Sequence, residues 1–228
     1  MIPLKDDIPT QTIPLITISL IAVNLVVYVY QLSLPSEGLE NFILRYGAIP
    51  NKLSHPFFIQ GHFIPQTLPP VLTIFTAMFL HGSLIHLLGN MLYLWIFGNS
   101  LEDNLGHIRF LFFYLLSGFF AAFIHTFSEV HSAIPMIGAS GAIAGILGAY
   151  FILFPRANVS TLFIFIIFFK VIRVPAVLIL GLWFLIQLLN AGNEGGSVAW
   201  YAHVGGFLAG VFLVRSFRRP IRRRRLRF

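Results

Sequence analysis

Serine, histidine and asparagine side chains occur inside segments that are otherwise apolar enough to lie in lipid. Ser140 opens one such segment, and His203 lies near the start of another. His86 and Asn90 belong to a third, where a spacing of four places them on one helical face. Polar side chains are costly within a bilayer and usually serve a function there. A serine with a histidine as general base could perform acyl transfer, the histidine later protonating the leaving amine.

The position of Ser140 at a helix start adds a means of stabilising negative charge. The first N–H groups of a helix have no partner within the helix, and the helix dipole favours an anion there. The Ser140 backbone N–H, with the side chains of His86 and Asn90, could therefore donate to an oxyanion, each donor contributing about 3 kcal/mol in the transition state. Taken alone, the serine is also explained by ordinary small-residue packing, with its hydroxyl bonded to a carbonyl.

The composition indicates that the elements carrying these residues are membrane helices. Of 228 residues, 57% are hydrophobic and 10% charged, and the mean hydropathy is +0.84. So few charges do not cover the surface of a soluble protein. The chain has no cysteine, which excludes a thiolate nucleophile, a disulfide framework and a cysteine-based metal site.

Apolar runs predict an all-α fold, a single membrane domain over residues 1–228 with six transmembrane helices. The segment between the first two helices, residues 33–70, is rich in proline and aromatic residues, and we expect a long interfacial loop. Residues 98–106 read as a polar turn, and 155–173 as a second interfacial loop. The six predicted spans are 13–32, 84–97, 108–127, 140–154, 174–190 and 198–214.

Charge patterning predicts the orientation of this multi-pass protein. The formal net charge is +7, and basic residues are concentrated in the tail at 215–228. The positive-inside rule places that tail in the cytoplasm, and six spans place the N-terminus there too. An arginine cluster beside a span indicates contact with anionic lipid, so we expect no nucleic-acid partner. The compact chain, without an evident organelle presequence, favours a prokaryotic plasma membrane.

The predicted topology brings the polar groups to one depth. The second, fourth and sixth helices all run from the outer face inward, so Ser140, His203, His86 and Asn90 lie in the outer part of the bilayer. Small residues on the fourth and sixth helices would allow the close approach that a Ser–His hydrogen bond needs. The glycines expected to pack around the site are Gly138, Gly141, Gly145, Gly206 and Gly210.

The sequence lacks the residues that other classes of intramembrane hydrolase need. A zinc protease needs a His-Glu-x-x-His motif or an equivalent ligand set, and the sequence contains none. An aspartyl dyad needs two buried aspartates, but Asp6, Asp7 and Asp103 fall outside the spans. No acidic residue lies at the outer depth to complete a triad. A Ser–His dyad remains.

Four motifs gather these residues: His81-Gly82-Ser83-Leu84-Ile85-His86-Leu87-Leu88-Gly89-Asn90, Glu102-x-x-x-Gly106, Gly138-Ala139-Ser140-Gly141 and Ala202-His203-x-x-Gly206-x-x-x-Gly210. With these motifs, residues 73–214 resemble the rhomboid intramembrane serine proteases. The resemblance implies that Ser140 and His203 form the dyad, and that His86 and Asn90 line the oxyanion hole. It implies a single transmembrane segment as substrate, cut near its outer end, with no metal, nucleotide or other cofactor required.

The sequence departs from some family members at two places. The first loop lacks a Trp-Arg pair, and Ala144 stands where a tyrosine would stack on the histidine, so support for the His203 ring must come from elsewhere. By analogy we expect loop 191–197 to act as a lid, and helix 174–190 as a gate with Trp183 and Phe184 on its bulky face.

Two other functions remain open at this point. A non-catalytic binder or chaperone of transmembrane segments would use the same groove but would not need the four polar residues together. A transporter predicts charged residues at mid-depth and paired broken helices, and neither is evident. The oligomeric state does not follow from the sequence.

Overall fold

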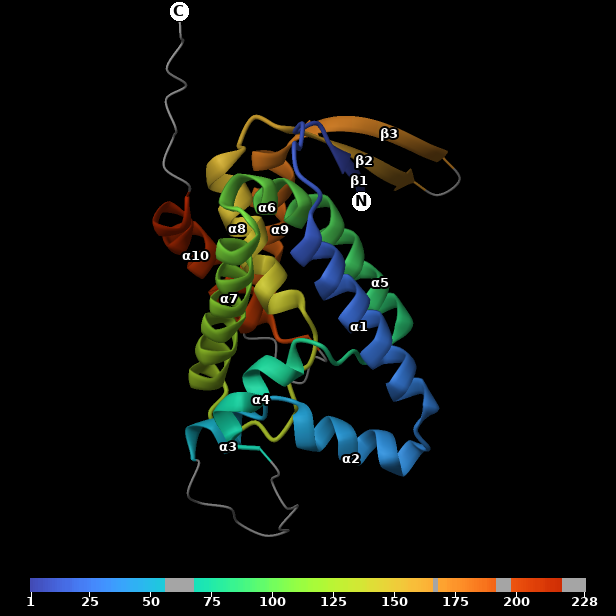
Figure 1. The fold of residues 1–228 in the computed structure, drawn as a ribbon, viewed down its shortest axis with the longest axis vertical. Helices are drawn as coiled ribbons and strands as arrows, with labels where there is room; N and C mark the ends of the chain where they lie inside the picture. Colours follow the sequence, from blue (N-terminus) through green and yellow to red (C-terminus); the bar gives the residue numbers. More distant parts are fainter. Residues whose placement is uncertain (56–67, 166–167, 192–197, 219–228) are drawn as a thin grey trace, which may run out of the picture.

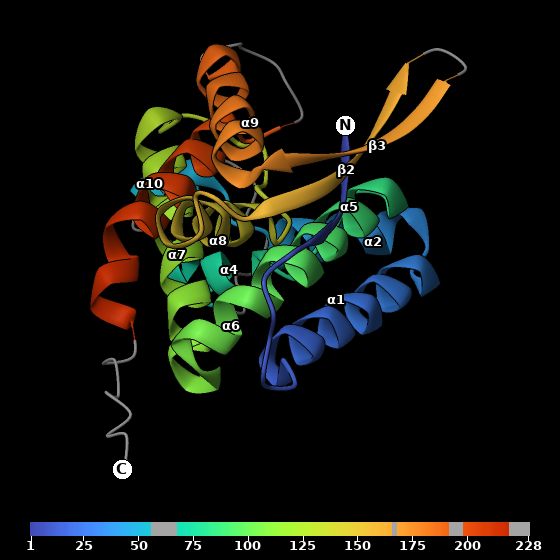
Figure 2. The ribbon, with the colours of Figure 1, turned by 90° about the horizontal axis from the view of Figure 1, so that it is seen from above.

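The computed structural model describes residues 1–55, 68–165, 168–191 and 198–218. Long helices form a bundle with a small sheet across one end, and shorter helices lie at the other end (Figures 1 and 2). The long helices are α1 (Leu15–Ser33), α5 (Leu84–Tyr93), α7 (His107–Ser128), α8 (Ser140–Leu153), α9 (Ala176–Asn190) and α10 (Trp200–Phe217). The shorter ones, at the end away from the sheet, are α2 (Ser36–Tyr46), α3 (Pro50–Ser54) and α4 (Pro70–Ala77). Helix α6 (Asn99–Leu105) continues α5 at the sheet end.

In the part of the chain that the structure describes, three helical stretches are long and apolar enough to cross a membrane: Leu15–Ser33, Leu84–Leu105 and His107–Ser128. The helices α8 and α9 are apolar but shorter. The predicted helix boundaries agree with the structure to within about three residues, except where the second span continues past residue 97. The count of six membrane crossings stays a prediction.

Helix α8 is the centre of the bundle and packs against α7 and α10. All its side chains from Ala142 to Tyr150 are buried. A helix that is apolar on every side is expected in such a position. Because α8 is surrounded by protein, its length does not have to match the thickness of the lipid bilayer.

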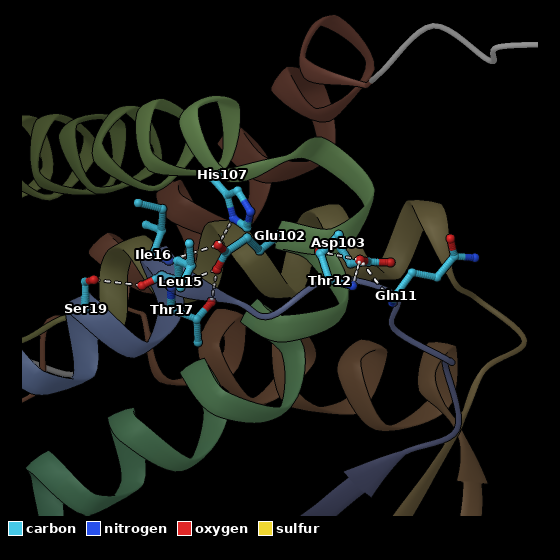
Figure 3. Close-up of polar contacts among 9 residues, drawn as sticks. All are labelled: Gln11, Thr12, Leu15, Ile16, Thr17, Ser19, Glu102, Asp103 and His107. Carbon is cyan, nitrogen blue, oxygen red and sulfur yellow. Dashed lines mark hydrogen bonds and ion pairs between the residues drawn. The ribbon is translucent and has the colours of Figure 1, made fainter.

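The second span is longer than the sequence indicated, and the turn expected at 98–106 is wrong. Helix α5 continues through a π-helical segment, Leu94–Gly98, into α6, and ends only where Gly106 adopts a φ of +85°. Two of the polar residues that suggested a turn, Glu102 and Asp103, are instead bonded to the start of α1 and the residues just before it (Figure 3). Glu102, fully buried, accepts hydrogen bonds from the backbone N–H groups of Ile16 and Thr17 at 2.9 and 2.8 Å.

An antiparallel sheet corrects the all-α prediction. Strands β1 (Ile2–Asp6), β2 (Asn158–Phe165) and β3 (Phe168–Pro175) pair in the order β1-β2-β3. Residues 155–173 therefore form a hairpin where an interfacial loop was expected. Their β-branched and aromatic side chains favour strands, and pairing satisfies backbone groups that a loop in the interface would leave open.

The N-terminal segment holds this sheet against the bundle. The Asp7 carboxylate accepts hydrogen bonds from the Asn158 side chain and backbone N–H at 2.9 and 2.8 Å. These bonds hold the pKa of Asp7 below its ordinary value. Asp6 accepts from the hydroxyls of Ser100 on α6 and Tyr150 on α8 at 2.6 and 2.7 Å.

The long loop expected at 33–70 is also partly helical. It contains α2 and α3, and α4 begins at its end. Ala48 pairs with Met136 through an isolated β-bridge, which ties this segment to the connection between α7 and α8. Residues 56–67 lie outside the described part of the chain.

Candidate active site

Glycines allow the backbones of α8 and α10 to touch. A Cβ atom added at Gly206 would lie 2.1 Å from the Gly141 carbonyl oxygen, and one at Gly210 would lie 1.9 Å from that of Gly145. Neither distance leaves room for a side chain. The packing role predicted for these glycines therefore corresponds to a physical contact between the two helices.

This contact brings together the serine and histidine singled out in the sequence. Ser140 is the first residue of α8, and His203 lies in the first turn of α10. The Ser140 Oγ and the His203 Nε2 are 2.9 Å apart, within hydrogen-bond distance. Both side chains are partly buried. The pair has the geometry of a nucleophile beside a base.

A residue that the sequence argument missed completes the surroundings of His203. Its Nδ1 lies 2.8 Å from the Oε1 of Gln187 on α9. The rings of Trp183 and Trp200 lie 5.9 and 6.2 Å from the imidazole, centroid to centroid. These contacts supply the ring support that Ala144 does not. Gln187 is a polar residue within an apolar span, the criterion that singled out His86 and Asn90, and that criterion would have found it.

His86 and Asn90 meet the chain just before Ser140. A Cβ atom added at Gly138 would lie 2.8 Å from the His86 Nε2 and 3.5 Å from the Asn90 Nδ2. Gly138 also has a φ of +118°, which L side chains rarely adopt. Only glycine suits this position, and its bare surface lets both polar side chains approach the turn that leads into α8.

His81 orients Asn90, a role that the sequence argument did not assign. The Asn90 Nδ2 donates to the His81 Nε2 at 2.9 Å, and both residues are buried. The His81 backbone is itself fixed, because its N–H and carbonyl bond to the amide of Gln31 on α1 at 3.0 and 3.1 Å. Asn90 keeps a second N–H that could donate to a ligand.

A small cavity of about 40 Å³ lies beside Ser140. Its lining is almost entirely small or apolar, with Met78, Gly118, Ala121 and Ala202 among the contributing residues. A cavity of about 10–15 Å³ is enough for one water molecule, so this cavity has room for a small group.

Other predicted features lie elsewhere. Glu102 is at the sheet end of the bundle, where it binds α1 and not the site (Figure 3). Trp183 and Phe184 face α10, with Phe184 stacked on Phe207 at 4.3 Å. The glycine-rich segment expected to act as a lid, 192–197, lies outside the described residues.

Comparison with known proteins decides the family. A family model of the Rhomboid domain matches residues 69–220, two thirds of the chain. The protein belongs to the rhomboid family. The match begins just before α4 and ends after α10, so it contains every residue of the site described above except Gln31. Family membership and the apolar helices make the chain an integral membrane protein.

Named relatives of this rhomboid come from mitochondria and bacteria. Rhomboid protein 1, mitochondrial, of Saccharomyces cerevisiae is 32% identical over 68% of the chain and 44% of the yeast protein. The rhomboid protease GluP of Bacillus subtilis is 33% identical over 64% of the chain and 26% of its own length. Presenilin-associated rhomboid-like protein A, mitochondrial, of Danio rerio is 31% identical over 65% of the chain and 37% of its own length. The chain thus spans less than half of each of these relatives.

Proposed function

We propose that this rhomboid is an intramembrane serine endopeptidase that cuts single-span membrane proteins near the outer end of their transmembrane segment. The observation that carries the proposal is the 2.9 Å contact between the Ser140 Oγ and the His203 Nε2 at the start of two closely packed helices. A membrane binder without activity needs the glycine packing but has no use for this pair.

The proposed reaction begins with transfer of the Ser140 hydroxyl proton to the His203 Nε2 while Oγ attacks the substrate carbonyl. The oxyanion accepts hydrogen bonds from the Ser140 backbone N–H and from the His86 and Asn90 side chains. His203 then protonates the leaving amine. Water, activated by the same imidazole, hydrolyses the acyl-serine and restores the enzyme.

The lining of the site suggests what the substrate presents. The cavity of about 40 Å³ beside Ser140, with its small and apolar lining, suits a small apolar side chain at the scissile bond. Substrate would enter beside α9, which packs on α8 and α10 and has no extensive contact with α5 in the described residues. A peptide must leave its helical form to expose a carbonyl, so helix-breaking residues favour cleavage.

The arginine tail supports a cytoplasmic C-terminus, and six crossings would place the N-terminus on the same side. The relatives are mitochondrial as well as bacterial, so the prokaryotic plasma membrane stays a prediction.

The test is cleavage of a labelled single-span substrate in liposomes by the wild type, Ser140→Ala and His203→Ala. We expect both substitutions to abolish cleavage while the variants keep the wild-type unfolding temperature. Cleavage that survives Ser140→Ala would show that another group is the nucleophile. Binding of several substrates without cleavage by the wild type would support the non-catalytic alternative.

A further inference from the structure

Gln187 stands on a different helix from either member of the dyad, yet it bonds directly to the proposed base. Its side chain is only 4% exposed, and its Oε1 lies 2.8 Å from the His203 Nδ1. We infer that Gln187 is a positioning residue, which fixes the proton of His203 on Nδ1 and makes the base depend on the position of α9. This inference rests on the proposed function.

The hydrogen bonds of the Gln187 amide determine which ring nitrogen carries the proton. The Gln187 Nε2 donates to the Trp183 carbonyl oxygen at 3.0 Å, which leaves Oε1 facing His203. A carbonyl oxygen only accepts, so the Nδ1 of His203 must be the donor. In the neutral ring, Nε2 then has a lone pair and accepts the Ser140 hydroxyl proton. The hydrogen bonds that link Trp183, Gln187, His203 and Ser140 are therefore consistent only when the His203 proton is on Nδ1 and the Ser140 hydroxyl donates to Nε2.

The same bond persists after the base has taken up its proton. Once Nε2 is protonated, the imidazolium donates from both nitrogens, and the Gln187 oxygen remains the acceptor at Nδ1. Without that oxygen, the tautomer with its proton on Nε2 becomes populated, and it cannot accept from Ser140. An uncharged amide thus serves at Nδ1, and among the described residues no acidic side chain bonds to the imidazole.

Because Gln187 lies on α9, its contact with His203 also depends on the position of that helix. Trp183, one turn earlier on α9, packs beside the same imidazole. If α9 moves aside to admit a substrate, both contacts with His203 are lost, whereas the Ser140–His203 pair lies on α8 and α10. The base regains its orientation only when α9 returns, so hydrolysis is coupled to closure around the substrate.

The first experiment compares Gln187→Leu and Gln187→Glu with the wild type in liposomes. For Gln187→Leu we expect kcat to fall about 10- to 100-fold with KM nearly unchanged, because orientation in the transition state is lost and binding is not. A carboxylate accepts at Nδ1 as the amide does, so Gln187→Glu should restore kcat. It also stabilises the imidazolium, which moves the acid limb of the kcat/KM profile to higher pH.

The matched control is Asn24→Leu. Asn24 is a buried amide on α1 that, like Gln187, donates to the carbonyl four residues earlier, at 2.7 Å. A purely structural role for Gln187 predicts that both leucine variants lower the unfolding temperature and leave kcat and the pH profile of the folded enzyme unchanged. That result would overturn the inference.

A second readout does not need activity. In ¹⁵N-histidine-labelled protein, with His203→Ala used for assignment, wild type should show protonated Nδ1 and unprotonated Nε2 at neutral pH. Gln187→Leu should shift the ring toward a mixture of tautomers. An unchanged ring would refute the inference even if no substrate is cleaved, and absent cleavage with the expected tautomers would refute only the proposed function.

The hairpin of β2 and β3 carries a separate inference. Its base is buried, with Val159 and Thr161 0% exposed, but its outer half extends beyond the helices (Figure 2). In the strand register, Ile164 pairs with Phe169 and therefore lies on the same face. Ile164 is 49% exposed and Phe169 69%, and the neighbouring Val171 is 55% exposed.

The charges around this apolar patch indicate what covers it. Lys170 and Arg173 are exposed on β3 itself. The hairpin lies across the end of the bundle where the basic tail begins, and Arg109 bonds to the Arg218 carbonyl at that end. Apolar side chains flanked by basic ones are typical of segments that lie in the interface of anionic lipids. We propose that the hairpin is an interfacial anchor, its patch in the acyl boundary and its cations against anionic headgroups.

Because the chain has no cysteine, a single spin label can test this anchor. Phe169→Cys is compared with Gln11→Cys, an exposed position before α1 whose backbone bonds to Asp103 on α6, at the sheet end of the molecule (Figure 3). In anionic liposomes we expect the label at 169 to be more accessible to oxygen than to a nickel chelate, and the reverse at 11. Lys170→Glu with Arg173→Glu should reduce that difference. Equal access to the chelate at both sites, or shielding of 169 from both reagents by a protein partner, would overturn the proposal.

Discussion

At the scale of single residues, two side chains 63 positions apart meet because the helices beneath them carry almost no side chains at their contact. The hydrogen bond of Ser140 to His203 depends on the distance between α8 and α10. That distance is set by glycines whose missing Cβ atoms would otherwise lie against backbone. Backbone cannot move aside as a flexible side chain can, so the chemistry of the site is sensitive to a single methyl group far below it.

Gly210→Ala is expected to destabilise the protein and to lower cleavage. The new Cβ would lie 1.9 Å from the Gly145 carbonyl oxygen, so the helices must separate, at a cost of about 1–3 kcal/mol. Gly89→Ala is the matched control, because a Cβ there meets no described atom within 4 Å and alanine is the better helix former by about 1 kcal/mol. Unfolding followed in detergent micelles should separate the two variants. Equal midpoints would contradict the packing argument.

The residues of the site differ in how far the sequence could predict them. Ser140 and His203 stand next to regularly spaced glycines, and His86 and Asn90 share a helical face, so their grouping follows from helix geometry. Gln187 lies on α9, which is apolar on nearly every side and gives no periodic sign of which face meets the bundle. Its polarity marks Gln187 as a candidate, but its pairing with His203 depends on the rotation of α9, which only the structure supplies.

At the scale of elements, the buried carboxylate of Glu102 on α6 bonds both to the start of α1 and to the start of α7. Glu102 bonds to Thr17 through its backbone N–H and its hydroxyl, at 2.8 and 2.7 Å, and also to His107 (Figure 3). The N-terminus of a helix favours a negative charge, and α1 has no acidic residue in its own first turn. The acceptor that α1 lacks locally thus comes from another element.

Glu102→Ala should detach the start of α1 and lower the free energy of unfolding by about 3 kcal/mol, because buried N–H groups lose their acceptor and His107 loses its partner. Asp103→Asn is the control. Its carboxylate accepts from Gln11 and Thr12 at the exposed end of the same helix, where the loss should be about 1 kcal/mol or less. Denaturant titration of both variants measures the difference, and a smaller effect at 102 than at 103 would refute it.

The three strands of the sheet show why the sequence alone does not predict every element of the fold. The run from 159 to 169 is β-branched and aromatic, but a short apolar run in a membrane protein does not reveal its pairing partner. Strand β1 comes from the other end of the sequence, pairing Ile2 with Leu162. Its attachment depends on Asp6 and Asp7, whose partners Tyr150 and Asn158 are equally remote. Local pattern is informative for helices, whose bonds are local, and much less so for strands.

At the scale of the whole molecule, the bundle is built around a helix too short for an ordinary span. The 14 residues of α8 extend about 21 Å, against about 30 Å of hydrocarbon. Because neighbouring helices surround it, α8 meets protein where an exposed helix would meet lipid. In the proposed orientation its first residue lies below the outer membrane surface, so that water reaching Ser140 from that side meets the N–H groups of the helix start.

This arrangement predicts six crossings, although in the described residues only three helical stretches are long and apolar enough by themselves. Six crossings put both ends of the chain on one side, whereas three would put them on opposite sides. Single cysteines at exposed positions distinguish the two, since the chain has none of its own. With an impermeant maleimide added outside, Glu37→Cys at the start of α2 and Ala133→Cys after the end of α7 should react. Gln11→Cys and Ser216→Cys should react only after the membrane is permeabilised. Reaction of Ser216→Cys in sealed vesicles, with Gln11→Cys protected, would show that α8, α9 and α10 do not all cross.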